Sequence, residues 1–353
     1  MRFAVPMREA ALRLPHYHAP LEGRATKLRL DFNENTVGCS RRVRAALARL
    51  SPGLVAIYPE YEETRRRLAR FFEVAPTEIL LTNGADDALR LIADVFLERG
   101  TAALVVEPTF PMYHFFVQLS GARLLRLRYS REMKFPMEAV CRALARGPRV
   151  FFLANPNNPT GTLVSLAQLQ KLLGAARRTL VVVDEAYWEF SGASVLEWIR
   201  RYPNLAVVRT FSKAAGLAGL RLGCLFANSA LAGALRRAQP PYAVNAAALV
   251  AADAAVRDAA SIQRYAREVC AVREELRAAL AGRGITSFPS AGNFLLADFG
   301  PGAPRMLRVL AQSGILLRDR SEDFGRPGFV RITIGTRAQM RGFLAALDAA
   351  WPG

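Results

Sequence analysis

The 353-residue sequence predicts an α/β protein with a mostly parallel β-sheet sandwiched by helices, followed by a smaller α+β C-terminal domain. Three observations predict this fold class. Short apolar runs alternate with amphipathic stretches between Glu78 and Asn228, the Pro240–Pro241 pair interrupts the chain, and a long alanine-rich region then leads into further strand-like runs. Alternation of this kind is typical of a parallel sheet, because parallel strands need crossover connections that are usually helices.

The first sheet is expected from seven apolar runs, at residues 78–82, 102–107, 123–129, 150–154, 180–184, 206–210 and 223–227. Helices are expected between several of them, at 86–98, 166–176 and 195–201, and an alanine-rich helical region covers about 245–281. The last part contains expected strands at 294–298, 315–318 and 329–334 and helices at 303–312 and 337–350. We therefore expect an N-terminal arm over 1–30, a large domain over 31–255 and a small domain over 256–353.

The composition excludes several function classes. Hydrophobic residues make up 52% of the chain, yet no apolar run approaches the roughly 18 residues of a membrane span. Three arginines and a glutamate interrupt the first 14 residues, so no signal-peptide core is present and we expect a cytoplasmic protein without a membrane partner. The four cysteines and three histidines lack metal-ligand spacing, so we expect neither a disulfide framework nor a metal site.

The net charge of +18 makes nucleic acid a candidate binding partner. The basic residues, however, are spread along the chain, only four are lysines, and no basic tail or interleaved aromatic platform is present. A DNA-binding regulator would also need a separate helix-turn-helix module, for which the chain has no spare length. We favour an arginine-rich bias on solvated helix faces and expect no nucleic-acid partner.

Polar residues follow the ends of several predicted strands, where ligands collect in open α/β sheets. Lys213, preceded by Ser212, follows the sixth strand. A lysine is ordinarily a solvated surface residue, but an amine in a partly desolvated pocket can attack a carbonyl, as Schiff-base formation requires. Asp184 closes the fifth strand, and Tyr187 follows it. This carboxylate can cap a helix or pair with a protonated ring nitrogen.

Three further motifs each allow a structural and a functional interpretation. Asn158 lies in a proline-rich segment, which is either an ordinary turn or a rigid loop that lets the Asn158 side chain donate a hydrogen bond to a ligand oxygen. The segment Gly84-Ala85-Asp86 is an ordinary capped turn or, with Arg221, a phosphate site at a helix start. Arg331, in an apolar strand, is either an edge residue or a guanidinium that binds a carboxylate through two parallel hydrogen bonds.

Together these motifs resemble the fold-type I pyridoxal-phosphate aminotransferases of the class-II group, most closely the histidinol-phosphate aminotransferases. The resemblance runs from about Leu30 to Thr336. It rests on the ordered motifs Asn33-Glu34-Asn35, Tyr58-Pro59-Glu60, Gly84-Ala85-Asp86, Asn158-Pro159-Thr160-Gly161, Asp184-Glu185-Ala186-Tyr187, Ser212-Lys213 with Arg221, and Arg331-Ile332-Thr333-Ile334-Gly335-Thr336.

The resemblance implies a role for each residue around pyridoxal 5′-phosphate. The implied catalytic residues are Lys213, which forms the Schiff base and moves the proton, Asp184, on the pyridine nitrogen, and Tyr187, on the phenolic oxygen. The other implied cofactor-binding residues are Gly84, Ala85, Asp86, Tyr113, Asn158, Thr210, Ser212, Arg221 and Tyr58. Of these, Tyr113 either stacks on the ring or is a core aromatic. Tyr58 is expected to reach into the neighbouring subunit of a homodimer. The implied substrate-binding residues are Arg331, Arg318, Asn35 and Tyr17.

The implied reaction transfers an amine between a small-molecule donor and a keto acid, with histidinol phosphate and 2-oxoglutarate as the leading pair. An aromatic or broad-range aminotransferase and a threonine-phosphate-type decarboxylase stay open, because pocket contacts decide the substrate. The sequence departs from the resembled pattern at Thr36, Cys39 and Ala215, and at His16-Tyr17-His18. These departures lie around the arm and the substrate pocket rather than the cofactor site.

Overall fold

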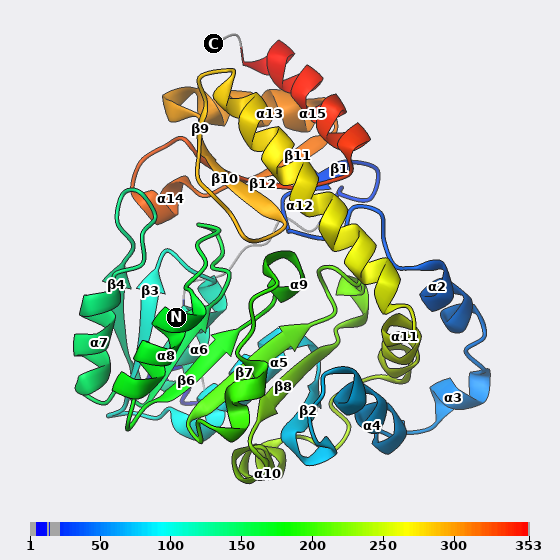
Figure 1. Cartoon of the computed structure of the whole chain (residues 1–353), viewed down its shortest axis with the longest axis vertical. Helices are drawn as coiled ribbons and strands as arrows, with labels where there is room; N and C mark the ends of the chain where they lie inside the picture. Colours follow the sequence, from blue (N-terminus) through cyan, green and yellow to red (C-terminus); the bar gives the residue numbers. More distant parts are fainter. Residues whose placement is uncertain (1–4, 13, 15–21, 352–353) are drawn as a thin grey trace.

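Two β-sheets organise the chain, and a long helix, α12 (Ala259–Ala281), runs from the first to the second (Figure 1). The computed structural model describes residues 5–12, 14 and 22–351. Within α12, Val269, Val272 and Leu276 are buried in the core of the second sheet, whereas Ile262 near its start packs against both cores. The helix is therefore the principal connection between the two halves.

The larger sheet has seven strands in the order β2-β8-β7-β6-β5-β3-β4. Its strands are β2 (Ile79–Thr82), β3 (Ala102–Glu107), β4 (Arg123–Arg128), β5 (Val150–Ala154), β6 (Leu180–Asp184), β7 (Leu205–Thr210) and β8 (Gly223–Ala227). All neighbouring pairs from β4 to β7 are parallel, and only β8 runs antiparallel to its neighbours. The predicted α/β class with a mostly parallel sheet is confirmed.

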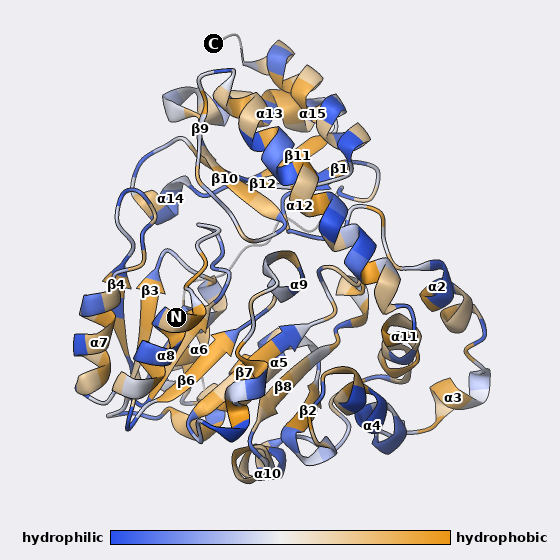
Figure 2. Ribbon diagram, in the orientation of Figure 1, coloured by the Kyte–Doolittle hydropathy of each residue, from blue (hydrophilic) through white to orange (hydrophobic). Residues whose placement is uncertain are grey.

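Helices cover both faces of this sheet because its central strands are apolar on both sides. In β6, Val181 and Val183 join one core cluster, while Leu180 and Val182 join the cluster on the other face. Figure 2 shows the apolar strands between helices whose outer faces are polar. The helices of this half are α2 (Arg41–Ala48), α3 (Pro52–Ala56), α4 (Glu62–Phe71), α5 (Gly84–Phe96), α6 (Pro111–Ser120), α7 (Met137–Ala145), α8 (Leu166–Ala175), α9 (Trp188–Ser191), α10 (Ser229–Ala238) and α11 (Ala246–Val256).

The smaller sheet has the order β1-β11-β12-β10-β9. Its strands are β1 (Leu28–Leu30), β9 (Thr286–Ser287), β10 (Phe294–Asp298), β11 (Ile315–Asp319) and β12 (Phe329–Thr333), accompanied by α13 (Ala303–Gln312), α14 (Ser321–Phe324) and α15 (Arg337–Ala350). Strand β1 pairs in parallel with β11, although its residues fall in the range expected to be an arm. The short helix α1 (Glu9–Leu12) lies against α6.

Local sequence signals explain where several helices begin. Ser165 caps α8, since its Oγ accepts from the backbone N–H of Gln168 while the Gln168 side chain accepts from the Ser165 N–H. Thr336 and Gln339 form the same reciprocal cap at α15. The alanine-rich region expected as one stretch is divided into α11 and α12, which are separated by two residues.

Candidate active site

A cavity of about 630 Å³ lies at the carboxyl ends of β5, β6 and β7, where those strands face the smaller sheet. This is the position at which open α/β sheets bind ligands. The cavity is lined by Phe32, Ala85, Asp86, Phe110, Pro111, Met112, Ala154, Pro156, Asn158, Asp184, Ala186, Tyr187, Thr210, Ser212, Lys213, Arg221, Arg318, Arg320 and Arg331. Most of the residues that the sequence singled out therefore meet at one site.

Lys213 reaches into the cavity from the turn after β7. The turn is fixed by Thr210, whose Oγ1 accepts from the Ser212 N–H at 3.1 Å and donates to the Ser212 Oγ at 2.9 Å. The Lys213 Nζ donates to the backbone carbonyl of Phe32 at 3.0 Å and lies 5.8 Å from the centroid of the Tyr187 ring. The amine is thus half-buried, with a neutral hydrogen-bond acceptor in place of a salt-bridge partner.

Asp184 is a buried carboxylate at the end of β6. It accepts from the Tyr113 hydroxyl at 2.8 Å and from the Ala186 N–H at 3.0 Å. Burial raises the pKa of Asp184 to about 6, although the bond from Tyr113 acts in the opposite direction. A cationic group of a ligand beside this carboxylate would offset the cost of its desolvation. A protonated ring nitrogen is such a cationic group.

Tyr113, for which both stacking on a bound ring and a place in the core were expected as alternatives, does not line the cavity. Its side chain is fully buried in the core beneath the site and stacks on Phe152 at 5.3 Å between ring centroids. Its hydroxyl instead holds Asp184 in place. The aromatic residue that does line the cavity from this segment is Phe110, which precedes α6 and meets Tyr113 edge to face.

One end of the cavity is built to receive an anion. Arg221, in the left-handed region with φ +55°, directs Nη1 to the Ser212 Oγ at 3.5 Å and Nη2 to the Asp86 carboxylate at 3.1 Å. It lies against Gly84, the first residue of α5, where an added Cβ would come within 2.5 Å of the guanidinium. Glycine with φ +80° therefore lets the arginine reach the positive end of the helix.

The opposite end carries arginines from the smaller sheet. Arg331 is buried on β12 and donates to the Asn158 side-chain oxygen and to the Asp31 carbonyl. Arg318 on β11 is its direct cross-strand partner, and its guanidinium lies 5.6 Å from the Phe32 ring centroid. Arg320, also a lining residue, is 7% exposed and lies 2.5 Å from Asp323. Three arginines thus line the same cavity as Lys213.

A family model described as aminotransferase class I and II matches residues 25–347. This chain belongs to the class I and II aminotransferase family. It is 39% identical to a histidinol-phosphate aminotransferase of Roseiflexus castenholzii, over 91% of this chain and 88% of that protein. It is 37% identical to one of Symbiobacterium thermophilum, over 92% of this chain and 90% of that protein.

Solved structures agree with this family membership. The histidinol-phosphate aminotransferase of Sinorhizobium meliloti in complex with pyridoxal-5′-phosphate has a TM-score of 0.87 and 26% identity, and the alignment covers 99% of this chain and 97% of that one. The L-threonine-O-3-phosphate decarboxylase of Porphyromonas gingivalis has a TM-score of 0.81 and 27% identity, with coverage of 92% and 100%. The expected fold-type I architecture is confirmed by these neighbours.

Two of the expected site residues of this aminotransferase, Asn35 and Tyr58, do not line the cavity of their own chain. Asn35 is a structural residue, because its Nδ2 donates to the Ala214 carbonyl and its Oδ1 accepts from the N–H groups of Val37 and Gly38. Tyr58 is 73% exposed and stacks on Tyr242 at 4.1 Å, away from this chain's own cavity. The predicted substrate contact Tyr17 lies outside the described residues.

The lining residues that the sequence reasoning missed include Phe32, Phe110 and Arg320. It also missed Asn33, whose side chain donates to the Tyr187 hydroxyl at 3.0 Å and so fixes that ring at the cavity wall. Asn33 has φ +56° and its N–H donates to Thr333 of β12, so it ties the segment after β1 to the small sheet. The quoted Asn33-Glu34-Asn35 motif contained this signal, but the wrong asparagine was assigned to the site.

Two kinds of feature are absent from residues 5–12, 14 and 22–351, the part of the chain that the structure describes. No cluster of three or more His, Cys, Asp or Glu side chains there could hold a metal ion. No helix within those ranges combines the length and the apolar character needed to cross a bilayer.

Proposed function

We propose that the chain is a pyridoxal-phosphate-dependent aminotransferase that converts histidinol phosphate and 2-oxoglutarate into imidazole acetol phosphate and glutamate. The observation that carries the proposal is one cavity lined by Lys213, by the buried Asp184 and by three arginines, Arg318, Arg320 and Arg331. Family membership and the named relatives support it independently.

The residues present fit the cofactor. Arg221, Ser212, Thr210 and the start of α5 would hold its phosphate, and Asp184 would pair with its ring nitrogen. Phe110 would provide the aromatic contact to the ring. Pyridoxal phosphate supplies an aldehyde for amine exchange and an electron-withdrawing ring that stabilises negative charge at the substrate carbon.

The chain's own residues then perform three tasks. The Lys213 Nζ, half-buried and bonded to a carbonyl, would be the base that takes the proton from the amine-bearing carbon of the substrate and delivers it to the aldehyde carbon of the cofactor. Asp184 stays ionised beside a cation and is held by Tyr113. The Tyr187 hydroxyl, fixed by Asn33, and Asn158, fixed by Arg331, are polar groups that line the same cavity as the amine.

The substrate proposal rests on charge. Histidinol phosphate carries a phosphate and 2-oxoglutarate two carboxylates, and Arg318, Arg320 and Arg331 can bind either as bidentate donors. The apolar wall of Phe32, Phe110 and Met112 favours the alternative, an aromatic or broad-range amino-acid substrate.

Single-turnover loss of the cofactor's visible absorbance, followed with histidinol phosphate, phenylalanine, tyrosine and glutamate, separates these substrates. We expect histidinol phosphate to react fastest, and Arg318→Gln to slow it by roughly 10-fold or more while affecting phenylalanine little. Arg308→Gln, an exposed arginine on α13, is the matched control. A faster reaction with phenylalanine would refute the histidinol-phosphate assignment, and a Lys213→Ala protein that still transaminates at the wild-type rate would refute the site itself.

We further propose a homodimer in which Tyr58 completes the neighbouring site. Apolar side chains are exposed around α3, namely Leu54, Val55, Ile57, Tyr58 and Tyr242, as expected of a surface that another chain covers. Mixing inactive Lys213→Ala and Tyr58→Ala proteins tests this arrangement. A hybrid dimer would hold one site with both wild-type residues, so activity should return on mixing, and a mixture without activity would contradict the shared site.

A further inference from the structure

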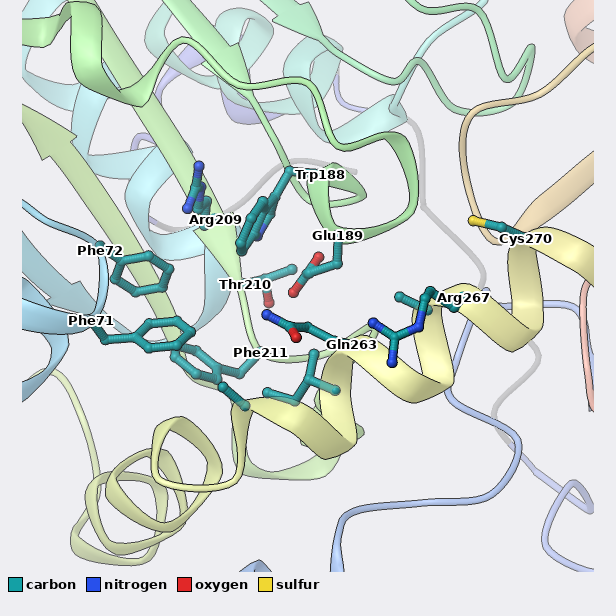
Figure 3. A pocket seen from close by; sticks show the side chains of 13 residues that line it. Phe71, Phe72, Trp188, Glu189, Arg209, Thr210, Phe211, Gln263, Arg267 and Cys270 are labelled. Atoms are coloured by element: carbon teal, nitrogen blue, oxygen red, sulfur yellow. The ribbon is translucent and has the colours of Figure 1, made fainter.

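A second cavity, of about 330 Å³, lies beside the carboxyl end of β7 (Figure 3). It is enclosed by the end of α4, by α9 and by the first half of α12, and Thr210 lines both this cavity and the candidate active site. The chain turns between them at α9, because Tyr187 faces the first cavity whereas Trp188 and Glu189 face the second. The proposed aminotransferase reaction uses none of the α4, α9 or α12 residues of this cavity.

Glu189 is the unexplained group in this cavity. Its Oε2 has no solvent contact and no hydrogen-bond partner among the residues that the structure describes. Desolvation raises the pKa of Glu189 to about 8, against the weaker opposing effects of its own backbone N–H and of Arg209. A buried carboxyl without a partner costs free energy that an incoming hydrogen-bond donor or cation would offset.

The nearest buried cation does not satisfy Glu189. The Arg209 guanidinium donates to Glu185 through Nε at 3.0 Å and Nη2 at 2.8 Å, and also to the Ser194 Oγ. Its face stacks on Trp188 at 3.9 Å. Arg209 is thus bonded to Glu185 and Ser194 rather than to Glu189, which lines the cavity.

The other walls are apolar on one side and polar at the rim. Phe71, Phe72 and Phe211 form an aromatic floor. Gln263 and Arg267 reach in from exposed positions on α12, and Figure 3 shows the Glu189 carboxyl and the Gln263 amide facing each other with the Arg267 guanidinium beside them. The cavity thus combines a carboxyl group, a guanidinium group and an apolar surface. Its volume is near the lower limit for pockets that bind small molecules.

We propose that this cavity binds a free α-amino acid with an apolar side chain. Its ammonium group would pair with Glu189, its carboxylate with Arg267, and its side chain would lie against the aromatic floor. A simple amine would leave the Arg267 contact unused, and a simple carboxylic acid would leave Glu189 unpaired. The zwitterion is therefore the ligand class that satisfies all three walls.

The site's position separates it from the reaction. It contacts α12 near Ile262, the residue that packs against both cores, and it shares only Thr210 with the candidate active site. An occupant would consequently lie where α12 leaves the larger sheet. The inference goes beyond the proposed transamination and does not depend on which amine the enzyme transfers.

Titration calorimetry on the borohydride-reduced holoenzyme tests the proposal, because reduction prevents an amino acid from reacting at Lys213. The probes are L-phenylalanine, 2-phenylethylamine and 3-phenylpropionate. We expect L-phenylalanine to bind once per chain, and the amine-only and acid-only probes to bind at least roughly 10-fold more weakly. Equal or tighter binding of either analogue, or no binding of L-phenylalanine, overturns the proposal.

Variants locate the binding in this cavity. Glu189→Gln and Arg267→Gln should each weaken L-phenylalanine binding by roughly 10-fold or more. Arg264→Gln, an exposed arginine on the same helix, and Glu197→Gln, an exposed acid, are the controls and should bind as wild type does. Because Arg267 is exposed, its variant keeps the test valid even if Glu189→Gln fails to fold. Unchanged affinity in Arg267→Gln would refute the site.

Discussion

Replacing Asp184 with asparagine should stabilise the cofactor-free protein while impairing the enzyme. Burial raises the pKa of this carboxyl from 3.8 to about 6, so keeping it ionised in the fold costs roughly 3 kcal/mol at pH 8. Asparagine cannot ionise. Its one oxygen can keep the bond that the Ala186 N–H donates, and its amide NH2, in place of the second oxygen, can donate to the Tyr113 hydroxyl oxygen. Allowing about 1 kcal/mol for weaker hydrogen bonds, we expect a net gain of roughly 2 kcal/mol.

The difference in stability between wild type and Asp184→Asn should depend on pH. Because the folded-state pKa is raised, the folded protein binds more protons than the unfolded chain between about pH 4 and pH 6, so the ionisation cost shrinks as the pH falls through that window. At pH 5 the cost is roughly half its value at pH 8, and the advantage of Asp184→Asn should fall below about 1 kcal/mol. Urea unfolding of both cofactor-free proteins at pH 8 and pH 5 measures this difference.

The same substitution should lower activity. With pyridoxal phosphate bound, Asp184→Asn loses a charge-assisted hydrogen bond to the ring nitrogen, and we expect kcat to fall by roughly 10- to 150-fold. Steady-state kinetics at saturating cofactor measures this loss. A cofactor-free Asp184→Asn protein that is less stable than wild type at pH 8 would refute the reasoning, since Asp184 would then be contributing to the fold rather than opposing it.

Two other substitutions probe the support of the site. Gly223→Ala should weaken cofactor binding and destabilise the protein by roughly 1–3 kcal/mol, because its Cβ would lie 2.4 Å from the backbone carbonyl carbon of Gly84. Gly219→Ala, with no atom within 4 Å of its Cβ, is the control. Equal cofactor dissociation constants for the two variants would contradict the prediction. Arg209→Gln leaves the buried Glu185 carboxylate unpaired and should lower the free energy of unfolding by roughly 3–5 kcal/mol; a loss below about 1 kcal/mol in urea unfolding would show that the pair is not needed.

Local signals were sufficient for the elements and for the residues attached directly to strand ends. Apolar runs bounded by polar residues located β3, β5 and β8 at their observed limits, and β6 ended at Asp184 as predicted. Because the carboxyl ends of parallel strands share one edge of a sheet, Asp184 and Lys213 had to meet there once the alternation of strands and helices was recognised. Chain order and strand period therefore determined the cofactor end of the site.

Only the tertiary structure decided which side chain of each loop faces the cavity. Phe110 and Tyr113 are three residues apart at the start of α6, and packing places the tyrosine beneath Asp184 and the phenylalanine at the wall. The second cavity likewise exists only because α12 crosses the end of β7, which brings Arg267 beside Glu189. Contacts between distant segments depend on how helices and sheets pack, and no local period in the sequence encodes them. The sequence by itself determined that Lys213 and Asp184 would share a site, and packing determined what surrounds them.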